Sequence, residues 1–253
     1  MAARKRGRKR RRNRGRFGFL YKLLSAVLIL AAIIGGCIVF FRVGHVEVSG
    51  QARYTQQQIV AAAGVEQGDN LLTLNKQVIS KRILSRLPYV DEITMVRHMP
   101  DTLAIGITEC TPVAAIQAEG AWWILDAGVK ILERADHAPD LPEVTGVTLL
   151  MPAVGVKCAV AEEQQFKLDS LGKLFHALEK RGMSDKAGCF NLEADNVIRM
   201  DYAGRFTVKL PMSTDFDYQM KVVAAAVKTL PETDRGNLDL TLEDAPHLIP
   251  YPN

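Results

Sequence analysis

One stretch constrains this chain more than any other: the nineteen residues from Leu23 to Phe41 carry no charge and are almost all apolar. At about 1.5 Å of helix rise per residue, such a stretch spans roughly the 30 Å hydrocarbon core of a bilayer. We therefore expect a transmembrane helix over residues 23–41, with everything after Phe41 on the opposite side of the membrane from residues 1–22.

Basic residues crowd the segment that precedes this stretch. Eleven of the 32 lysines and arginines fall in residues 1–22, which contain no aspartate or glutamate. Because positively charged segments resist translocation, we expect residues 1–22 to be a cytoplasmic tail and the residues after Phe41 to lie outside the cytoplasm. The residues expected to set this topology are Arg4, Lys5, Arg6, Arg8, Lys9, Arg10, Arg11, Arg12, Arg14 and Arg16.

Two other signals could produce an apolar segment near an N-terminus. A cleaved signal peptide normally has an apolar core of about 7–15 residues followed by small residues, whereas Phe40, Phe41 and Arg42 follow here. The sequence Ile34-Gly35-Gly36-Cys37 loosely resembles a lipoprotein signal, but apolar residues follow Cys37 where a polar tether would be expected. We therefore favour a spanning helix over both.

The overall charge of +4 conceals an acidic exterior, because residues 23–253 hold 21 basic residues against all 28 acidic ones. An arginine-rich tail could neutralise nucleic-acid phosphates. Beside a spanning helix, however, it is more simply a topology signal that also attracts anionic lipid head groups. We expect membrane lipid, and no nucleic acid, as the partner of the tail.

The exterior divides by its patterns into two blocks. Residues 43–111 predict the order strand, helix, helix, strand, strand, with a capping box at Thr55 and Gln58 opening the first helix. The expected elements are 43–50, 55–64, 75–87, 91–97 and 102–109.

Residues 112–253 predict a strand-rich second block with two helices. Trp122 and Trp123 point to opposite faces of one strand, and we expect Trp123 in the core. The last expected strand, residues 237–242, alternates leucines with polar residues before three prolines that cannot donate to a ladder. The expected elements are strands 122–125, 129–132, 197–202, 205–210 and 237–242, and helices 162–181 and 216–230.

Short motifs follow one another in order from Val46 to Gly146. They are Val46-Glu47-Val48-Ser49-Gly50, Leu87-Pro88-Tyr89-Val90, Met99-Pro100-Asp101-Thr102-Leu103-Ala104-Ile105, Glu109-Cys110-Thr111-Pro112-Val113-Ala114, Trp123-Ile124-Leu125-Asp126-Ala127-Gly128 and Leu141-Pro142-Glu143-Val144-Thr145-Gly146. In this order, behind a single spanning helix with a basic tail, they resemble the FtsQ/DivIB family of bacterial cell-division proteins, and the first block looks like a POTRA domain. Cys110 departs from the family, which more often has a basic residue after the glutamate.

The resemblance implies an α+β fold: a single transmembrane helix, then a POTRA domain (β-α-α-β-β) and a mixed β domain with two helices. The implied boundaries are a basic cytoplasmic tail at 1–22, a transmembrane helix at 23–41, a POTRA domain at 43–111, and a β domain with a C-terminal partner-binding strand at 112–253.

The resemblance also implies partners. The last strand would dock the exterior part of an FtsB/DivIC-type protein, with an FtsL-type protein as third member, and link them to the septal peptidoglycan synthase. The free edge of a terminal strand suits this use, because its unpaired N–H and C=O groups can pair with another chain. By position, the contact residues would be Leu238, Asp239, Leu240, Thr241 and Leu242, whose leucines we expect to close the core.

No constellation of catalytic residues emerges from the sequence. Ser170-Leu171-Gly172-Lys173 has the Ser-x-x-Lys spacing of penicillin-binding enzymes, but it lies on an amphipathic helix whose polar face needs such residues, and the companion motifs are missing. The five histidines are scattered, the cysteines show no metal-ligand spacing, and phosphate-binding glycine loops are lacking. We expect no catalytic, cofactor or metal site.

These observations favour a non-enzymatic, single-pass scaffold of the division machinery in the plasma membrane at the septum. One alternative is a POTRA-bearing secretion or outer-membrane assembly component, which would need a transmembrane β-barrel that residues 112–253 are too few to build. Another is a membrane-anchored cell-wall enzyme, which would need a catalytic site that these residues do not supply.

Overall fold

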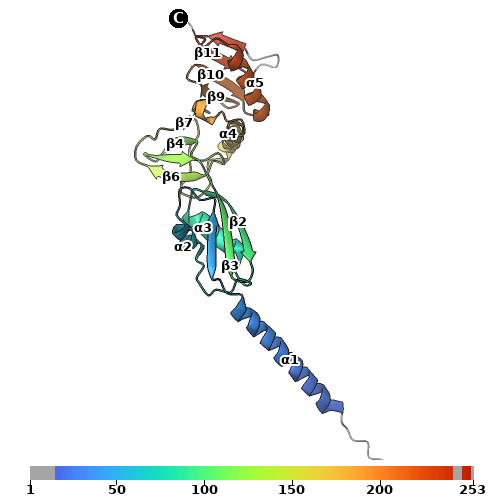
Figure 1. The fold of residues 1–253 in the computed structure, drawn as a ribbon. Coiled ribbons are helices and arrows are strands. Elements are labelled where there is room, and N and C mark those ends of the chain that lie inside the picture. Colours follow the sequence, from blue (N-terminus) through green and yellow to red (C-terminus); the bar gives the residue numbers. More distant parts are fainter. Residues whose placement is uncertain (1–14, 242–246, 252–253) are drawn as a thin grey trace, which may run out of the picture.

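The computed structural model describes residues 15–241 and 247–251. It consists of a long helix, α1 (Gly15–Phe40), followed by two units that lie one beyond the other (Figure 1). The helix extends eight residues before the expected Leu23, to Gly15, which is the first described residue. Residues 18–40 of α1 are long and apolar enough to cross a membrane, and none of that span is buried against protein.

The first unit has the predicted order of elements. Its strands form a three-stranded sheet in the order β1-β3-β2, in which β1 runs parallel and β2 antiparallel to β3. A turn at residues 99–101 joins β2 to β3, and the predicted order of elements is confirmed. The elements are β1 (His45–Ser49), α2 (Gln56–Ala63), α3 (Lys76–Arg86), β2 (Val90–His98) and β3 (Thr102–Glu109).

Capping side chains explain where the two helices of this unit start and stop. Thr55 and Gln58 form the predicted capping box of α2, and Gly64 ends that helix in the left-handed conformation at φ 62°. The side chain of Asn75 accepts the amides of Gln77 and Val78 and so caps α3. Both helices pack on one face of the sheet.

The core of the first unit is made by aliphatic side chains from these helices and from alternate positions of the strands. Ile59, Ile83 and Ile105 are fully buried in it. The spacing of residues 75–87 predicts that Val78 shares one apolar stripe with Ile79 and Ile83, but Val78 is 43% exposed. Val78 is adjacent to Ile79 in the sequence, and one residue along an α-helix corresponds to a rotation of about 100°. The side chain of Val78 therefore points away from the narrow face of α3 that Ile79 and Ile83 bury.

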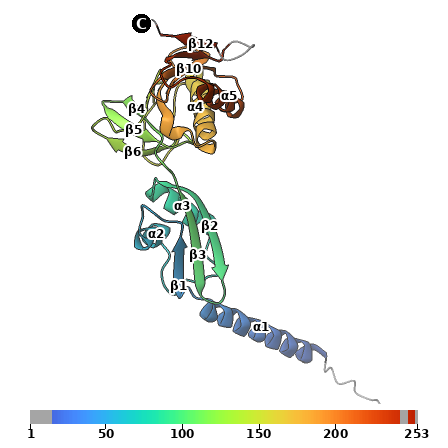
Figure 2. The same cartoon turned by 45° about the horizontal axis from the view of Figure 1, so that its top comes forward.

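The second unit is built on one nine-stranded mixed sheet, in the order β12-β11-β10-β9-β8-β7-β4-β5-β6, with α4 and α5 packed beside it (Figure 2). Its elements are β4 (Ala114–Ala118), β5 (Ala121–Leu125), β6 (Ile131–Ala135), β7 (Glu143–Thr145), α4 (Glu162–Lys180), the short 3-10 helix η1 (Ser184–Lys186), β8 (Ala187–Asn191), β9 (Val197–Tyr202), β10 (Phe206–Pro211), α5 (Phe216–Thr229), β11 (Gly236–Asp239) and β12 (His247–Pro250).

Both predicted helices of the second unit are present, and their apolar faces pack against the sheet. Leu171 and Phe175 of α4 and Met220 of α5 are buried, and the ring of Phe175 meets that of Phe190 edge to face at 5.0 Å between centroids. Trp123 is in the core, 6% exposed, and its indole N–H donates to the Ala118 carbonyl at 3.1 Å. These predictions are confirmed.

Several strands of the second unit were not predicted. β4 and β8 are rich in alanine and glycine, and β7 has only three residues, so none shows the alternation of large apolar residues that marks a strand. In β8, Gly188 lets the backbone lie against Asp201, where a Cβ would be 2.9 Å from that residue's Cβ. The strand expected at 129–132 is displaced to Ile131–Ala135 as β6.

A compact joint connects the two units. Tyr89, the residue just before β2, is buried with Ile124 and Leu132 of the second unit. Its hydroxyl donates to Glu133 at 2.7 Å, and the Arg53 guanidinium lies 3.7 Å from its ring centroid. Burial, followed by the hydrogen bond to Glu133, raises the pKa of Tyr89 to about 12.

Lys130 makes a second set of contacts across the joint. Its Nζ donates to the Val90 carbonyl at 2.9 Å and to Cys110 Sγ at 3.1 Å, and lies 3.8 Å from Asp126. Burial raises the pKa of the Cys110 thiol to about 11, although the Lys130 ammonium acts in the opposite direction. The division of the exterior at residues 111 and 112 stays a prediction.

Candidate partner-binding edge

The outermost strand on one side of the nine-stranded sheet is β12, which pairs antiparallel with β11. It follows β11 and is the last strand of the part of the chain that the structure describes. β11 in turn pairs parallel with β10, so β11 has a neighbour on each side. The free edge therefore belongs to β12.

The direction of the backbone groups in β12 follows from its pairing. The amide of Tyr251 donates to the Arg235 carbonyl at 3.3 Å, which turns Tyr251 toward β11. Backbone groups alternate along a strand, so Ile249 also faces β11, whereas Leu248 and Pro250 face away. The free edge therefore offers the N–H and C=O of Leu248 and the C=O of Pro250.

Proline fits this position for a physical reason. Because the nitrogen of Pro250 points away from β11, its missing N–H costs the sheet no ladder bond, which is where strands tolerate proline. Pro250 lies opposite Gly236 in the register, and a Cβ on Gly236 would be 2.4 Å from the Ile249 carbonyl oxygen. The close approach of the two strands thus requires glycine at that point.

The side chains of β12 present one buried and one open face. Leu248 packs partly against the core, whereas Ile249 is 51% and Tyr251 43% exposed. The Tyr251 hydroxyl donates to Thr207 Oγ1 at 2.8 Å, and Thr207 donates to Asp201 at 2.9 Å. Tyr251 thereby reaches across β11 to β10 and ties the end of the chain to the sheet.

The structure corrects the predicted contact strand in one respect. We expected residues 237–242 to be the terminal strand with a free edge, but β11 covers Gly236–Asp239 and the side expected to be free is paired with β12. Leu238 and Leu240 are buried in the core as expected. Leu242 lies outside the described residues.

Asp239 and Thr241 stabilise the chain just after β11. Burial alone would raise the pKa of Asp239, but hydrogen bonds from the Thr241 hydroxyl and amide and the charge of Lys209 lower it below its ordinary value. Lys209 Nζ lies 3.4 Å from Asp239 Oδ2. Whether Leu238, Asp239, Leu240 and Thr241 contact a partner stays a prediction.

The sequence did not lead us to expect a strand at Leu248 and Ile249, or a role for Tyr251. The prolines at 246, 250 and 252 argued against a strand there, because a proline cannot donate to a ladder. The apolar pair Leu248-Ile249 between two of these prolines was the available signal. In β12 the apolar pair forms the middle of a four-residue edge strand, and the nitrogen of Pro250 points away from β11. The strand therefore accommodates both the apolar pair and the proline.

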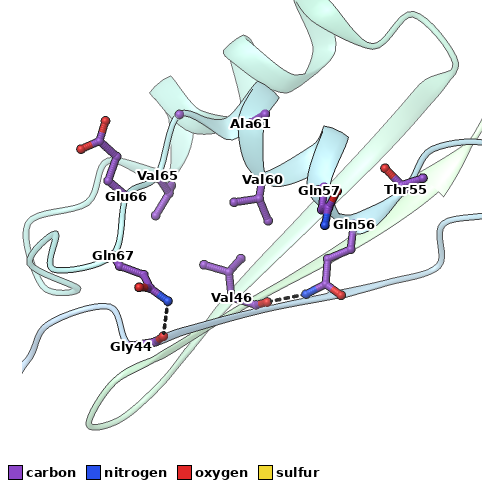
Figure 3. A pocket seen from close by; sticks show the side chains of 11 residues that line it. Gly44, Val46, Thr55, Gln56, Gln57, Val60, Ala61, Val65, Glu66 and Gln67 are labelled. Atoms are coloured by element: carbon purple, nitrogen blue, oxygen red, sulfur yellow. Dashed lines mark hydrogen bonds between the residues drawn. The ribbon is translucent and has the colours of Figure 1, made fainter.

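The structure also contains a groove between β1 and α2, with a volume of about 940 Å³ (Figure 3). Val46, Val60 and Val65 form its apolar wall. The side-chain amide of Gln56 donates to the Val46 carbonyl at 2.8 Å, and that of Gln67 to the Gly44 carbonyl at 3.5 Å. These amides cover acceptors on the free edge of β1, so β1 is a less available strand edge than β12.

Ser170, the serine of the Ser-x-x-Lys spacing, has a structural role. Ser170 is 1% exposed, and its hydroxyl lies within hydrogen-bond distance of the Phe166 and Met212 carbonyls, at 2.8 and 3.1 Å. We had placed Ser170 on the polar face of its helix; it faces the core instead, where it joins α4 to the end of β10. Lys173 is exposed.

Other ionisable groups show no metal centre within residues 15–241 and 247–251. No three His, Cys, Asp or Glu side chains in this part of the chain are placed to hold a metal ion. Its four cysteines, Cys37, Cys110, Cys158 and Cys189, are all unbridged.

Nine of the ten residues expected to set the topology precede the described part of the chain. Arg4, Lys5, Arg6, Arg8, Lys9, Arg10, Arg11, Arg12 and Arg14 lie outside the described residues. The backbone of Arg16 belongs to the first turn of α1. The topology that these residues were expected to set therefore stays a prediction.

Comparison with known proteins identifies relatives of the chain. A family model described as "POTRA domain, FtsQ-type" matches residues 41–109, the stretch that contains the first unit. The cell division protein FtsQ of Geotalea daltonii is 27% identical over 214 residues, which cover 74% of this chain and 77% of that protein. The chain is similar in sequence to FtsQ and DivIB cell division proteins.

Other relatives match shorter regions. FtsQ of Streptomyces venezuelae is 33% identical over 122 residues, 46% of this chain and 45% of that protein. DivIB of Geobacillus kaustophilus is 30% identical over 118 residues, 44% of this chain and 45% of that protein. The chain thus spans about three quarters of the Geotalea FtsQ but less than half of these two proteins.

Among solved structures, the major extracytoplasmic domain of DivIB from Geobacillus stearothermophilus matches 49% of this chain and 99% of its own length, at 12% identity and a TM-score of 0.30. A score this low supports no argument about the arrangement of the chain. The similarity to FtsQ and DivIB proteins rests on the sequence matches, and the α+β fold rests on the structure described above.

Proposed function

We propose that this chain is a non-enzymatic, single-pass scaffold of the bacterial division machinery. Its relatives are named cell division proteins, its first unit matches the FtsQ-type POTRA domain, and α1 can span a membrane. The basic tail would lie in the cytoplasm and both units outside it, at the division septum. The partners would be FtsB/DivIC-type and FtsL-type single-span proteins, and through them the septal peptidoglycan synthase.

The free edge of β12 is the observation that supports a binding role most directly. It offers one donor and two acceptors of the backbone beside two exposed apolar side chains, those of Ile249 and Tyr251. An extended segment of a partner could add to the sheet through these groups, with Ile249 and Tyr251 selecting the side chains that fit. The contact surface would be this outer strand, backed by the previously predicted residues Leu238 to Thr241.

Substitution at Leu248 tests this role. Leu248→Pro removes the only outward amide of the edge but leaves the bonds between β11 and β12, because that amide does not face β11. Leu248→Ala keeps the amide and loses a similar part of the side-chain packing, so it is the matched control. Pull-down of the exterior segment of an FtsB/DivIC-type protein should fall at least about ten-fold for the proline variant, equivalent to about 1.4 kcal/mol. Equal binding by the two variants would contradict docking at β12.

The non-enzymatic part of the proposal has its own test. Incubating the purified chain with peptidoglycan should release no fragments, because Ser170 is sealed in the core by its two carbonyl contacts. Release of fragments that is lost on Ser170→Ala would overturn it and favour an anchored cell-wall enzyme.

A further inference from the structure

The chain that leaves the spanning helix is hydrogen-bonded to a turn of the first unit. The amide of Leu71 donates to the Phe41 carbonyl at 2.8 Å, and Asn70 Nδ2 donates to the Ile38 carbonyl at 3.3 Å. Carbonyls at the end of a helix lack partners within the helix. Asn70 therefore caps α1 from outside, and the turn at residues 69–72 lies beside the last turn of the spanning helix.

The turn between β2 and β3 reaches the same end of the first unit. The Asp101 carbonyl accepts the amides of Gly44 at 2.8 Å and His45 at 3.2 Å, only a few residues after α1 ends. Both views show this turn beside the end of α1 (Figures 1 and 2). Two loops that are distant in the sequence thus flank the point where the chain leaves the membrane.

Each of these loops carries an exposed apolar side chain. Leu72 is 42% and Met99 53% exposed. The helix ends at Phe40, and the ring of Phe40 meets that of the next residue, Phe41, edge to face at 5.2 Å. We call the set Phe41, Leu72 and Met99 the membrane-proximal face.

A lipid surface is the partner that the position of this face indicates. The face is continuous with α1, so its side chains lie at the level where the apolar span gives way to head groups. Apolar side chains at that depth gain by entering the boundary between head groups and acyl chains. Arg42, exposed directly after the span, is placed to meet lipid phosphates. The nearby Asp101 carboxylate is occupied by His45 at 3.4 Å and Thr102 at 3.0 Å.

We propose that the first unit rests on the bilayer that α1 spans, with Leu72 and Met99 inserted into the head-group boundary. Together with α1 this makes three points of attachment, which fix the tilt of the unit relative to the membrane. The inference does not depend on a division partner and would hold for the isolated chain in lipid.

Depth-dependent quenching of tryptophan tests this proposal on the full chain. Met99→Trp and Leu72→Trp place a reporter at each inserted position, and Met151→Trp is the matched control because Met151 is 89% exposed on a loop of the second unit. The chain is reconstituted in phosphatidylcholine vesicles with or without lipid brominated near the head group. The native Trp122 and Trp123 give a background that the wild-type chain measures.

The added emission at positions 99 and 72 should fall by about two-fold or more in brominated lipid, as expected for a side chain at the head-group boundary, whereas that at position 151 should not change. Emission at both positions that is quenched no more than at Met151 would overturn the proposal. The proposal would also be overturned if the tryptophan at position 99 were shielded from a water-soluble quencher in native membranes but not in pure lipid vesicles. A protein, and not lipid, would then cover the face. Unchanged circular dichroism confirms that the variants fold. Reporters at positions 72 and 99 lie on different loops, so a disturbance that one substitution causes locally would not account for quenching at both.

Discussion

Single polar side chains hold the irregular parts of the exterior in place. Glu109, at the end of β3, accepts the amides of Ala52 and Arg53 at 3.0 and 2.8 Å and so fixes the loop that leads into α2. Lys130 does the same at the joint, where its Nζ donates to Cys110 Sγ, just after β3. Lys130, which supplies the positive charge of this contact, belongs to the second unit.

Glu109 should stabilise the fold in a pH-dependent way. Burial alone would raise its pKa, but the amides of Ala52, Arg53 and Tyr54 lower it below the ordinary value of 4.5. Because the pKa is lower in the folded state, the stabilisation is present above the unfolded-state pKa and is lost as pH falls through the folded-state pKa. Glu109→Gln should lower the free energy of unfolding by about 1 kcal/mol at pH 7, and the difference should shrink below about pH 4.

Urea unfolding of the full chain in detergent at several pH values measures this difference. Glu232→Gln, a change at an exposed residue, is the control and should have little effect. A Glu109→Gln deficit that grows on acidification would contradict the assigned role.

At the scale of elements, the accuracy of the sequence analysis followed the strength of the local signal. α2, α3 and β3 were predicted within a residue or two because caps, a stop at Gly64 and strict alternation mark their ends. β7 and β12 were missed because their pairing is with strands distant in the sequence, and three or four residues carry no period. The free edge could not be assigned from sequence, since it depends on which strand pairs last.

The joint between the units should behave as one coupled element. Tyr89 and Glu133 come from different units and share a hydrogen bond of 2.7 Å. In a double-mutant cycle, Tyr89→Phe and Glu133→Gln should show a coupling of about 1 kcal/mol in the free energy of unfolding. Asp217 pairs with Lys180 and Arg181 and is not part of the joint. The effects of Tyr89→Phe and Asp217→Asn on the free energy of unfolding should therefore be additive. Additivity of the first pair would mean that the contact does not join the units.

In the whole molecule, the two units follow α1 one after the other, so the first unit is next to the helix and the second is farther from it. α1 leads into β1 through four residues that are hydrogen-bonded to the first unit, and the second unit continues from the joint to β12 (Figure 1). A short tether restricts the partner search to the membrane plane and raises the effective concentration of other single-span proteins.

Lengthening the tether should therefore weaken assembly. A long Gly/Ser spacer inserted between Arg42 and Val43 breaks the contacts with Asn70 and Leu71 and lets the exterior drift from the membrane. Energy transfer between the labelled chain and an FtsB/DivIC-type partner in vesicles should fall several-fold, as effective concentration declines with linker length. The same spacer at Ala153, in a loop of the second unit, should have little effect. Equal loss from both insertions would mean that the tether length is irrelevant.

Amide hydrogen exchange tests, residue by residue, whether a partner strand adds to the outer edge of β12. Addition of the exterior segment of an FtsB/DivIC-type protein should slow exchange at the Leu248 amide by about ten-fold or more, because that amide gains a hydrogen-bond acceptor. The amides of Leu238 and Leu240, which already face β10, should change little. Binding that leaves the Leu248 amide unprotected and instead slows exchange at Val46 on β1 would mean that the partner docks at β1 and not at β12.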